Sequence, residues 1–316
     1  MGDRSSIEWT DATWNPVTGC SKISAGCKFC YAERITERWG QRFTEIHLHP
    51  DRLDQPLRWR QPRRIFVNSM SDLFHEDIPI DFLARVFNVM ACGTVACGKR
   101  HQHDEECSTW PPHTFQILTK RAERMHRVLT EELPEHVGER WPGDAAISIA
   151  LDVNWPLPNV VLGVSCEDQP RADKRIPWLL KTPAALRFVS LEPLLGMIEL
   201  RNEWVSGQRL RTRGTDRPGG GTVCIPRIDW VIVGGESGGS PGRALVERFQ
   251  SPFTGSIFYK PKPYALEWVS SLRDQCVAAS VPFFFKAWGG PTAKSGGRFL
   301  DGRTWDEYPT VGRSRT

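Results

Sequence analysis

The sequence predicts an α/β protein, a full or partial TIM-type barrel with about seven parallel strands. Short runs of β-branched and aromatic residues recur along the chain of 316 residues, and amphipathic helical stretches separate them. The apolar runs are continuous rather than alternating, which is typical of parallel strands that helices cover. A doubly wound sheet is the alternative architecture.

Each strand is predicted from its residue types. A short strand within residues 7–19 ends at Gly19, and a loop with three cysteines follows it. Six more apolar runs are predicted strands, at 65–68, 114–118, 160–165, 186–190, 230–233 and 282–286.

The helices between the strands are predicted from their periodicity. After the cysteines, Tyr31, Ile35 and Trp39 recur at four-residue spacing, and Gly40 can end that helix. In the next helical stretch, residues 80–90, the apolar side chains fall at spacings of three and four and share one face. Further helices are predicted at 121–131, 171–181 and 263–279.

The length of the chain allows one large core, and we expect a single barrel domain over 1–316. No run approaches the roughly eighteen apolar residues of a membrane span, and the N-terminus lacks the apolar core of a secretion signal. We therefore expect a cytoplasmic protein without a membrane partner. The nine cysteines then indicate metal ligands or buried thiols rather than disulfides.

Three cysteines close together are the most informative feature. Cys27 and Cys30 form a C-x2-C pair, and six residues separate Cys20 from Cys27. Three thiolates are one short of the set that closes a structural zinc or four-cysteine iron–sulfur site, so a cubane cluster held here would keep one iron open. Two alternatives are a zinc knuckle with a fourth ligand such as His47 or His49, and unrelated buried thiols.

Polar residues cluster where the predicted strands end. Active sites of parallel barrels lie at the carboxyl ends of the strands, so these side chains are expected at one mouth. Capping of the following helices would explain any one of them, but six strand ends in register favour a functional rim. The candidates are Ser69, Ser71, Asp72, Thr119, Lys120, Ser165, Glu167, Asp168, Ser190, Glu192, Glu236, Ser237 and Lys286.

The formal net charge of +4 permits a nucleic-acid partner without indicating one. Basic runs lie at 58–64, 119–127 and 209–217, where a solvated surface is the ordinary explanation. The chain has neither a dinucleotide fingerprint nor a Walker-type loop, so nucleotide hydrolysis is not indicated.

The order of strand, cysteine loop and helix resembles the first βα unit of radical S-adenosylmethionine (SAM) enzymes, which carry three cysteines in that loop. Most of those enzymes space the first two cysteines by three residues, whereas six separate them here. Over nearly its whole length the chain is similar to a family of phage and prophage proteins, named for a three-cysteine motif and distantly related to radical-SAM enzymes. The blocks that carry this resemblance are IEWTDATWNPVTGC, GCKFCYAER, FVNSMSDLFH, TFQILTKRAERM, GVSCEDQ, RFVSLEPLLG, DWVIVGGESG, SLRDQCVAASVPFFFKAWG and LDGRTWDEYP.

The resemblance implies a [4Fe-4S] cluster on Cys20, Cys27 and Cys30, with SAM on its open iron. An electron donor would reduce the cluster, SAM would be cleaved, and the resulting radical would abstract hydrogen from an unidentified substrate. A nucleic-acid base or nucleotide, in phage DNA modification or repair, is one candidate substrate. Members of the family are often encoded beside a three-Cys-motif partner protein, which is a candidate partner here.

The resemblance also suggests roles for the strand-end residues. By analogy with radical-SAM barrels, Ser71 or Asp72 would face the methionine amino group, and Ser165 and Glu167 would hydrogen-bond the ribose. Four charged residues would be left for substrate binding or proton transfer. They are Lys120, Glu192, Glu236 and Lys286.

Three segments look like insertions relative to the family pattern, at 92–112, 201–227 and 247–260. The first is rich in cysteine and histidine and could bind a structural zinc, with a polar loop as the alternative because its spacing matches no standard finger. The candidate zinc ligands are Cys97, His101, His103 and Cys107.

Two other functions stay open at the level of sequence. A non-catalytic zinc-binding adaptor would hold metal on the three cysteines and bind a partner at the rim. A barrel hydrolase or nuclease would use Asp72, Glu192, Glu236 and Lys286 without the cysteines.

Overall fold

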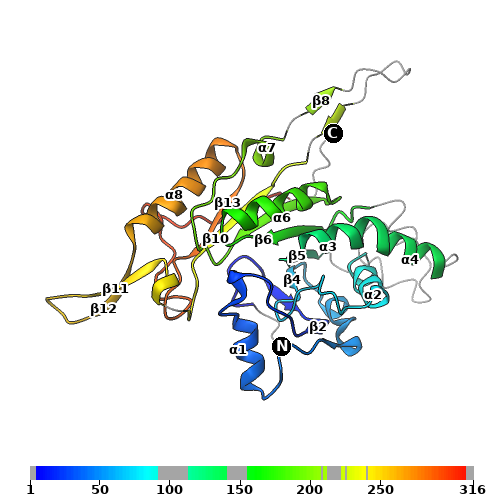
Figure 1. Cartoon of the computed structure of the whole chain (residues 1–316), viewed down its shortest axis with the longest axis horizontal. Helices are drawn as coiled ribbons and strands as arrows, with labels where there is room; N and C mark the ends of the chain where they lie inside the picture. Colours follow the sequence, from blue (N-terminus) through cyan, green and yellow to red (C-terminus); the bar gives the residue numbers. More distant parts are fainter. Residues whose placement is uncertain are drawn as a thin grey trace.

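A seven-stranded sheet forms the centre of the molecule. The computed structural model describes residues 5–91, 113–140, 155–207, 209–211, 222–224, 226–239 and 241–310 (Figure 1). The sheet order is β1 (Ala12–Trp14), β4 (Arg64–Val67), β5 (Thr114–Thr119), β6 (Val160–Ser165), β7 (Leu186–Leu191), β10 (Trp230–Gly234) and β13 (Phe283–Ala287). Every adjacent pair is parallel.

The order of the strands in the sheet is their order in the chain. A doubly wound sheet reverses its order at a switch point, and this sheet has no reversal, so that alternative is wrong. Within the described residues β1 and β13 form the two edges and do not pair with each other. The fold is therefore a partial TIM-type barrel.

Helices follow the strands, as the periodicity predicted. They are α1 (Tyr31–Arg38), α2 (Ile80–Ala91), α3 (Ala122–Arg127), α4 (Leu133–Arg140), α6 (Gln169–Lys181), α7 (Asn202–Val205) and α8 (Pro263–Ala278). A π-helical turn, Val128–Glu132, joins α3 to α4. Asp168 begins α6 by accepting the Arg171 N–H at 3.0 Å, which satisfies one of the free donors of the first turn. None of the described helices is long and apolar enough to cross a membrane.

Three small antiparallel hairpins lie outside the main sheet. They pair β2 (Val17–Thr18) with β3 (His47–Leu48), β8 (Arg209–Arg211) with β9 (Thr222–Cys224), and β11 (Val246–Gln250) with β12 (Ile257–Pro261). The last two fall in the predicted insertions 201–227 and 247–260. The predicted insertion 92–112, with its candidate zinc ligands Cys97, His101, His103 and Cys107, lies outside the described residues.

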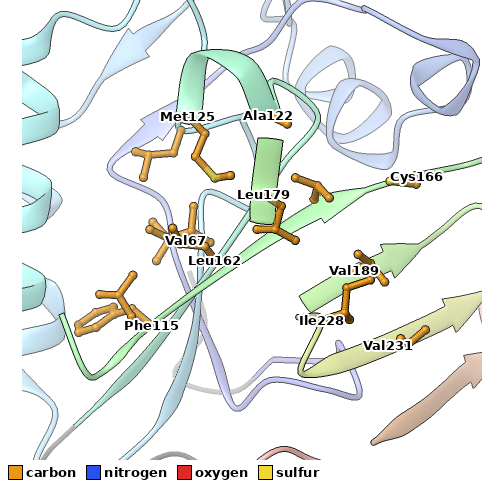
Figure 2. Packing of buried hydrophobic residues seen from close by; sticks show 14 of the residues in the cluster. Val67, Phe115, Ala122, Met125, Leu162, Cys166, Leu179, Val189, Ile228 and Val231 are labelled. Atoms are coloured by element: carbon orange, nitrogen blue, oxygen red, sulfur yellow. The ribbon is translucent and has the colours of Figure 1, made fainter. Parts of the chain in front are cut away.

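One face of the sheet packs against the helices. Figure 2 shows Val67, Phe115 and Leu162 of the strands in one cluster with Met125 of α3 and Leu179 of α6. All five side chains are at most 1% exposed. Burying each large apolar side chain stabilises the fold by about 1.5–3 kcal/mol, so this layer fixes the helices on the outside of the partial barrel.

The opposite face of the sheet carries aromatic rings. Gly163 lies on this face, and a Cβ there would come within 2.3 Å of the Phe188 ring, so the ring occupies the space that a side chain would need. The Tyr308 hydroxyl donates to the Glu8 carbonyl at 3.1 Å, which joins the two ends of the described chain beneath the rings. The apolar side chains of this inner cluster are Trp9, Phe66, Val161, Phe188, Trp230, Ile232 and Phe284.

Candidate functional site

The three cysteines lie on one loop at the carboxyl end of the sheet, which we call the cysteine loop (residues 19–30). Cys20 follows β2, Cys27 ends the 3₁₀ turn Ala25–Cys27, and Cys30 is the first residue before α1. All three thiols are free and partly exposed. By contrast, the thiols of Cys166 and Cys276 are buried.

Gly19 fixes the start of the loop. Its φ of +93° is a conformation that favours glycine, and a Cβ there would lie 2.0 Å from the Glu45 carbonyl oxygen. Gly19 forms an isolated parallel bridge with Ser71, which follows β4, and the Cys20 N–H donates to the Phe43 carbonyl at 2.7 Å. The cysteine loop therefore begins directly beside a predicted cofactor-binding residue.

Asp72 is a buried acceptor for several donors. Its carboxylate accepts the Thr119 hydroxyl at 2.7 Å, the Lys120 N–H at 3.0 Å and the Phe74 N–H at 3.1 Å. Arg121 donates to the same carboxylate at 3.3 Å. Because both oxygens are engaged, Asp72 ties the end of β5 to the loop after β4.

Arg121 connects this network to the first cysteine. Its guanidinium lies 3.6 Å from the Cys20 sulfur and donates to the Ser21 hydroxyl at 2.8 Å. The buried His75 ring contacts the same hydroxyl at 2.8 Å. Burial and the nearby Asp72 charge together raise the pKa of Cys20 to about 12, although Arg121 opposes the rise. Without a metal, the Cys20 thiol is therefore protonated at neutral pH.

Glu167 holds the middle of the cysteine loop from the end of β6. The side chain is fully buried; it accepts the Gly26 N–H at 3.1 Å and pairs with Arg175 of α6 at 2.8 Å. Burial favours a raised pKa, but the hydrogen bond from Ser24, the Arg175 charge and the Gly26 N–H outweigh it and lower the pKa of Glu167. A Cβ on Gly26 would meet the Glu167 carboxyl at 3.1 Å, so a larger residue would have to displace this side chain slightly.

A second ion pair holds the loop from the other side. The Arg243 guanidinium donates to Glu236 at 2.8 Å and to the Ala25 carbonyl at 3.0 Å. Burial raises the pKa of Glu236, although the Arg243 charge opposes the rise. The second carboxylate oxygen of Glu236 is buried and has no hydrogen-bond partner among the described residues. Residues 24–26 are thus restrained by Glu167 and by Arg243.

Helix α1 is tied to the same region. Arg34 donates to the carbonyls of Gly238 at 3.0 Å and Ser237 at 3.2 Å, in the segment that follows Glu236. Both ends of the C-x2-C pair are therefore anchored to residues that follow β10.

Glu192 and Lys286 form an ion pair at the ends of β7 and β13. The two charges lie 2.9 Å apart, and the Ser190 hydroxyl donates to Glu192 at 3.0 Å. The Ser165 hydroxyl donates to the Glu192 carbonyl at 3.1 Å. Burial favours a lower pKa for Lys286, but the Glu192 charge and hydrogen bond outweigh it and raise the pKa. While the pair persists, Lys286 is an ammonium donor rather than a base.

Tyr31 ties the start of α1 to the loop after β4. It is the first residue of α1, and its hydroxyl donates to the Ser69 carbonyl. The residue is 45% exposed, but burial of its hydroxyl raises its pKa, and the charges of Cys30 and Glu192 act in the same direction.

The donor set fits an iron–sulfur cluster with a bound cofactor. Three free thiols lie on one loop, and the buried Ser71 hydroxyl beside that loop has no partner among the described residues. As the side chains stand, no three Cys, His, Asp or Glu residues of the described ranges form a metal-binding group. The thiols would have to turn toward one another to share a metal.

The structure brings most predicted site residues to one mouth, and it adds basic and aromatic residues that the sequence reasoning did not select. Asp72, Lys120, Glu167 and Glu236 surround the cysteine loop. The additional residues are His75, Arg121, Arg175, Arg243 and Tyr31. Two of these residues could have been found from the sequence, because Arg121 follows the candidate Lys120 and Tyr31 follows Cys30. No sequence feature indicated the other three.

The two histidines considered as a fourth zinc ligand, His47 and His49, contact other residues. The His49 ring lies 2.8 Å from the Thr18 hydroxyl. His47 lies 3.8 Å from Glu45 and is nearly half exposed.

Comparison with known proteins assigns the family. The chain belongs to DUF5131, a family of proteins of unknown function, whose sequence model matches residues 4–247 and 255–309. The unmatched residues 248–254 include the tip of the β11–β12 hairpin. A mutant of spore photoproduct lyase is a similar solved structure, with 10% identity, a TM-score of 0.44, and coverage of 88% of this chain and 76% of that chain. The comparison with curated proteins found no match.

Proposed function

We propose that this DUF5131 member is a radical-SAM-type enzyme whose Cys20, Cys27 and Cys30 hold a [4Fe-4S] cluster. The observation that supports the proposal is the position of three free, partly exposed thiols on one loop at the carboxyl end of a parallel partial barrel. Active sites of such barrels lie at this end. Three thiols leave one iron of a cubane open, which suits a bound cofactor.

When bound, the cluster and SAM supply a 5′-deoxyadenosyl radical that abstracts hydrogen from a substrate. The Ser71 hydroxyl, buried and without a partner among the residues that the structure describes, is the better candidate of the Ser71–Asp72 pair for binding the cofactor. Asp72 already accepts four hydrogen bonds and acts by holding Lys120 and Arg121.

Ser165 and Glu167 were both predicted to bind the ribose, but their contacts suggest different roles for the two residues. Glu167 is fully buried and engaged with Gly26 and Arg175, so we assign it to positioning the cysteine loop. Ser165 donates to the Glu192 carbonyl and keeps an acceptor oxygen for a ligand.

Lys286 and Glu192 are the candidates for substrate binding and proton transfer. The protonated Nζ of Lys286 lies 2.9 Å from Oε1 of Glu192. Lys120, whose side chain lies over Gly26, adds a cation beside the cysteine loop. Glu236 contributes by holding Arg243 on the loop.

The substrate and partners belong to the same proposal. A nucleic-acid base or nucleotide is the candidate substrate, and an electron donor and a three-Cys-motif partner protein are the candidate partners. Phage origin is an expectation of the sequence resemblance.

The test is anaerobic purification, reconstitution with iron and sulfide, and an assay for 5′-deoxyadenosine after addition of SAM and dithionite. We expect a brown protein with about four iron atoms per chain that forms 5′-deoxyadenosine. Cys27→Ala should abolish both properties, whereas the matched control Cys276→Ala, a buried thiol on α8, should retain them.

Other outcomes decide between the alternatives. Colourless protein that carries zinc and leaves SAM intact would refute the proposal and favour the adaptor. Hydrolytic activity that survives Cys27→Ala would favour the barrel hydrolase or nuclease.

A further inference from the structure

The β11–β12 hairpin extends away from the sheet, beyond α8 (Figure 1). Its apolar side chains are exposed: Phe253 at the tip is 96% exposed, Ile257 53% and Phe249 42%. A two-stranded hairpin has no core of its own that would account for these residues. Exposed apolar side chains gathered on one element indicate a binding surface.

Basic side chains accompany the aromatic rings. The Lys260 ammonium lies 4.3 Å from the ring centroid of Phe249 and 5.2 Å from that of Phe258. Residues 246–262 contain three basic residues, Arg248, Lys260 and Lys262, and one acidic residue, Glu247, so this segment carries a small positive charge. The exposed surface of the hairpin is therefore aromatic and cationic, which is complementary to a polyanion with flat rings.

A cavity lies between the cysteine loop and the residues on either side of the hairpin, Leu245 before it and Tyr264 after it. It has a volume of about 280 Å³, and its lining includes Ala25 of the cysteine loop and Leu194 after β7. The lining on the other side includes Arg243, Tyr264 and Trp268. The Tyr264 and Trp268 rings, on the first turns of α8, lie 4.8 Å apart. The cavity is slightly smaller than ordinary ligand pockets of about 300–1,000 Å³, so it has room for a small group only.

We infer that the β11–β12 hairpin and the start of α8 bind single-stranded nucleic acid. Unpaired bases would stack on the exposed rings of Phe249, Phe253 and Phe258, with phosphates beside Lys260. The strand then leads toward the cavity at the cysteine loop. A single strand fits better than a duplex because stacking requires unpaired bases. The inference deepens the proposed function by naming the substrate class, and it rests on that function only for the reaction that follows binding.

The test measures binding on the metal-free protein, so it is independent of the cluster. The probe is a fluorescein-labelled oligothymidylate of about 20 nucleotides, followed by fluorescence anisotropy, with the corresponding duplex for comparison. We expect Phe253→Ala and Lys260→Glu each to weaken binding about tenfold, the effect of losing one stacked base or a phosphate contact. Added salt should also weaken binding of the unmodified chain.

Two matched controls separate the hairpin from general surface effects. Phe299→Ala removes another exposed ring, 68% exposed, and Lys174→Glu reverses an exposed charge on α6. Both should bind the probe as the unmodified chain does.

The outcomes distinguish this inference from the proposed function. Absence of binding, preference for the duplex, or equal affinity of the hairpin variants and the controls would overturn the hairpin surface, and a protein partner would then be sought for it. Because the hairpin lies outside the cysteine loop, Phe253→Ala should still form 5′-deoxyadenosine from SAM. If the unmodified chain binds the oligonucleotide but does not cleave SAM, the enzyme proposal is refuted and the binding inference still stands.

Discussion

Replacing Glu167 with glutamine tests whether a buried carboxylate orders the cysteine loop. Glu167 is fully buried, and the side chain of its partner Arg175 is 6% exposed. Glutamine keeps the volume and one carbonyl acceptor, but it leaves the Arg175 charge without its partner. Removing one member of a buried pair costs about 3–5 kcal/mol, and the retained acceptor places Glu167→Gln near the lower value, about 3 kcal/mol.

The stability assay is urea unfolding of the metal-free protein, with Glu199→Gln, an exposed glutamate, as the control. A second readout is the rate at which maleimide modifies each cysteine, mapped by mass spectrometry of the peptides. If Glu167 restrains Gly26, Cys27 should react faster in Glu167→Gln while the buried Cys276 does not change below the unfolding transition.

The pH dependence follows from the direction of the pKa shift. The pKa of Glu167 is lowered in the folded chain from an ordinary value of 4.5, so its stabilisation is complete above that pH. The stabilisation is lost as the pH falls through the lowered value, because the native state must then bind a proton it disfavours. The difference in unfolding free energy between the unmodified chain and Glu167→Gln should therefore shrink in acid. A stability loss below about 0.5 kcal/mol, the range of ordinary surface substitutions, with unchanged Cys27 reactivity would refute the restraint.

Two further substitutions test the sheet and the second ion pair. Gly163→Ala places a Cβ 2.3 Å from the Phe188 ring and should destabilise the protein by about 3 kcal/mol in urea unfolding, whereas Gly196→Ala, with its nearest neighbour at 3.8 Å, should be nearly neutral. Equal urea midpoints for the two variants would contradict the close packing of Gly163 against the Phe188 ring. Lys286→Met should cost about 2 kcal/mol because Glu192 keeps a charge without its partner, and adding Glu192→Gln should restore part of that loss. If the double variant is no more stable than Lys286→Met, the two side chains are not coupled.

The sheet was predictable because its strands are continuous apolar runs. The predicted strand 160–165 matches β6, and the prediction 186–190 ends one residue before β7 does. Buried parallel strands need such runs, and the residues between them carry helical periodicity, so local sequence was sufficient. The prediction 121–131 missed the continuation through a π-helical turn into α4, because the extra residue of a π-helical turn shifts the positions of the apolar side chains that follow it.

The site was predictable only in part. The sequence indicates that a polar side chain lies at the end of a strand, but it does not indicate which residues that side chain will hydrogen-bond. Glu167 and Glu236 were expected at the mouth and lie there, but their hydrogen bonds go to Gly26 and, through Arg243, to Ala25. Those partners are separated from the carboxylates by long stretches of chain or by a turn with no periodic pattern. The segment 247–260 was predicted only as an insertion relative to the family pattern, and its antiparallel pairing and exposed rings required the three-dimensional structure.

The restraints on the cysteine loop also set an order of events during synthesis. The loop leaves the ribosome early, whereas Glu167 follows its partner Gly26 by 141 residues and Arg243 follows Ala25 by 218 residues. The nascent chain therefore presents its three thiols on an unrestrained segment until β6 and the residues after β10 have been made. A metal that binds at that time would bind three thiols on a flexible segment. A metal that binds the completed protein would bind a loop that Glu167 and Arg243 already restrain.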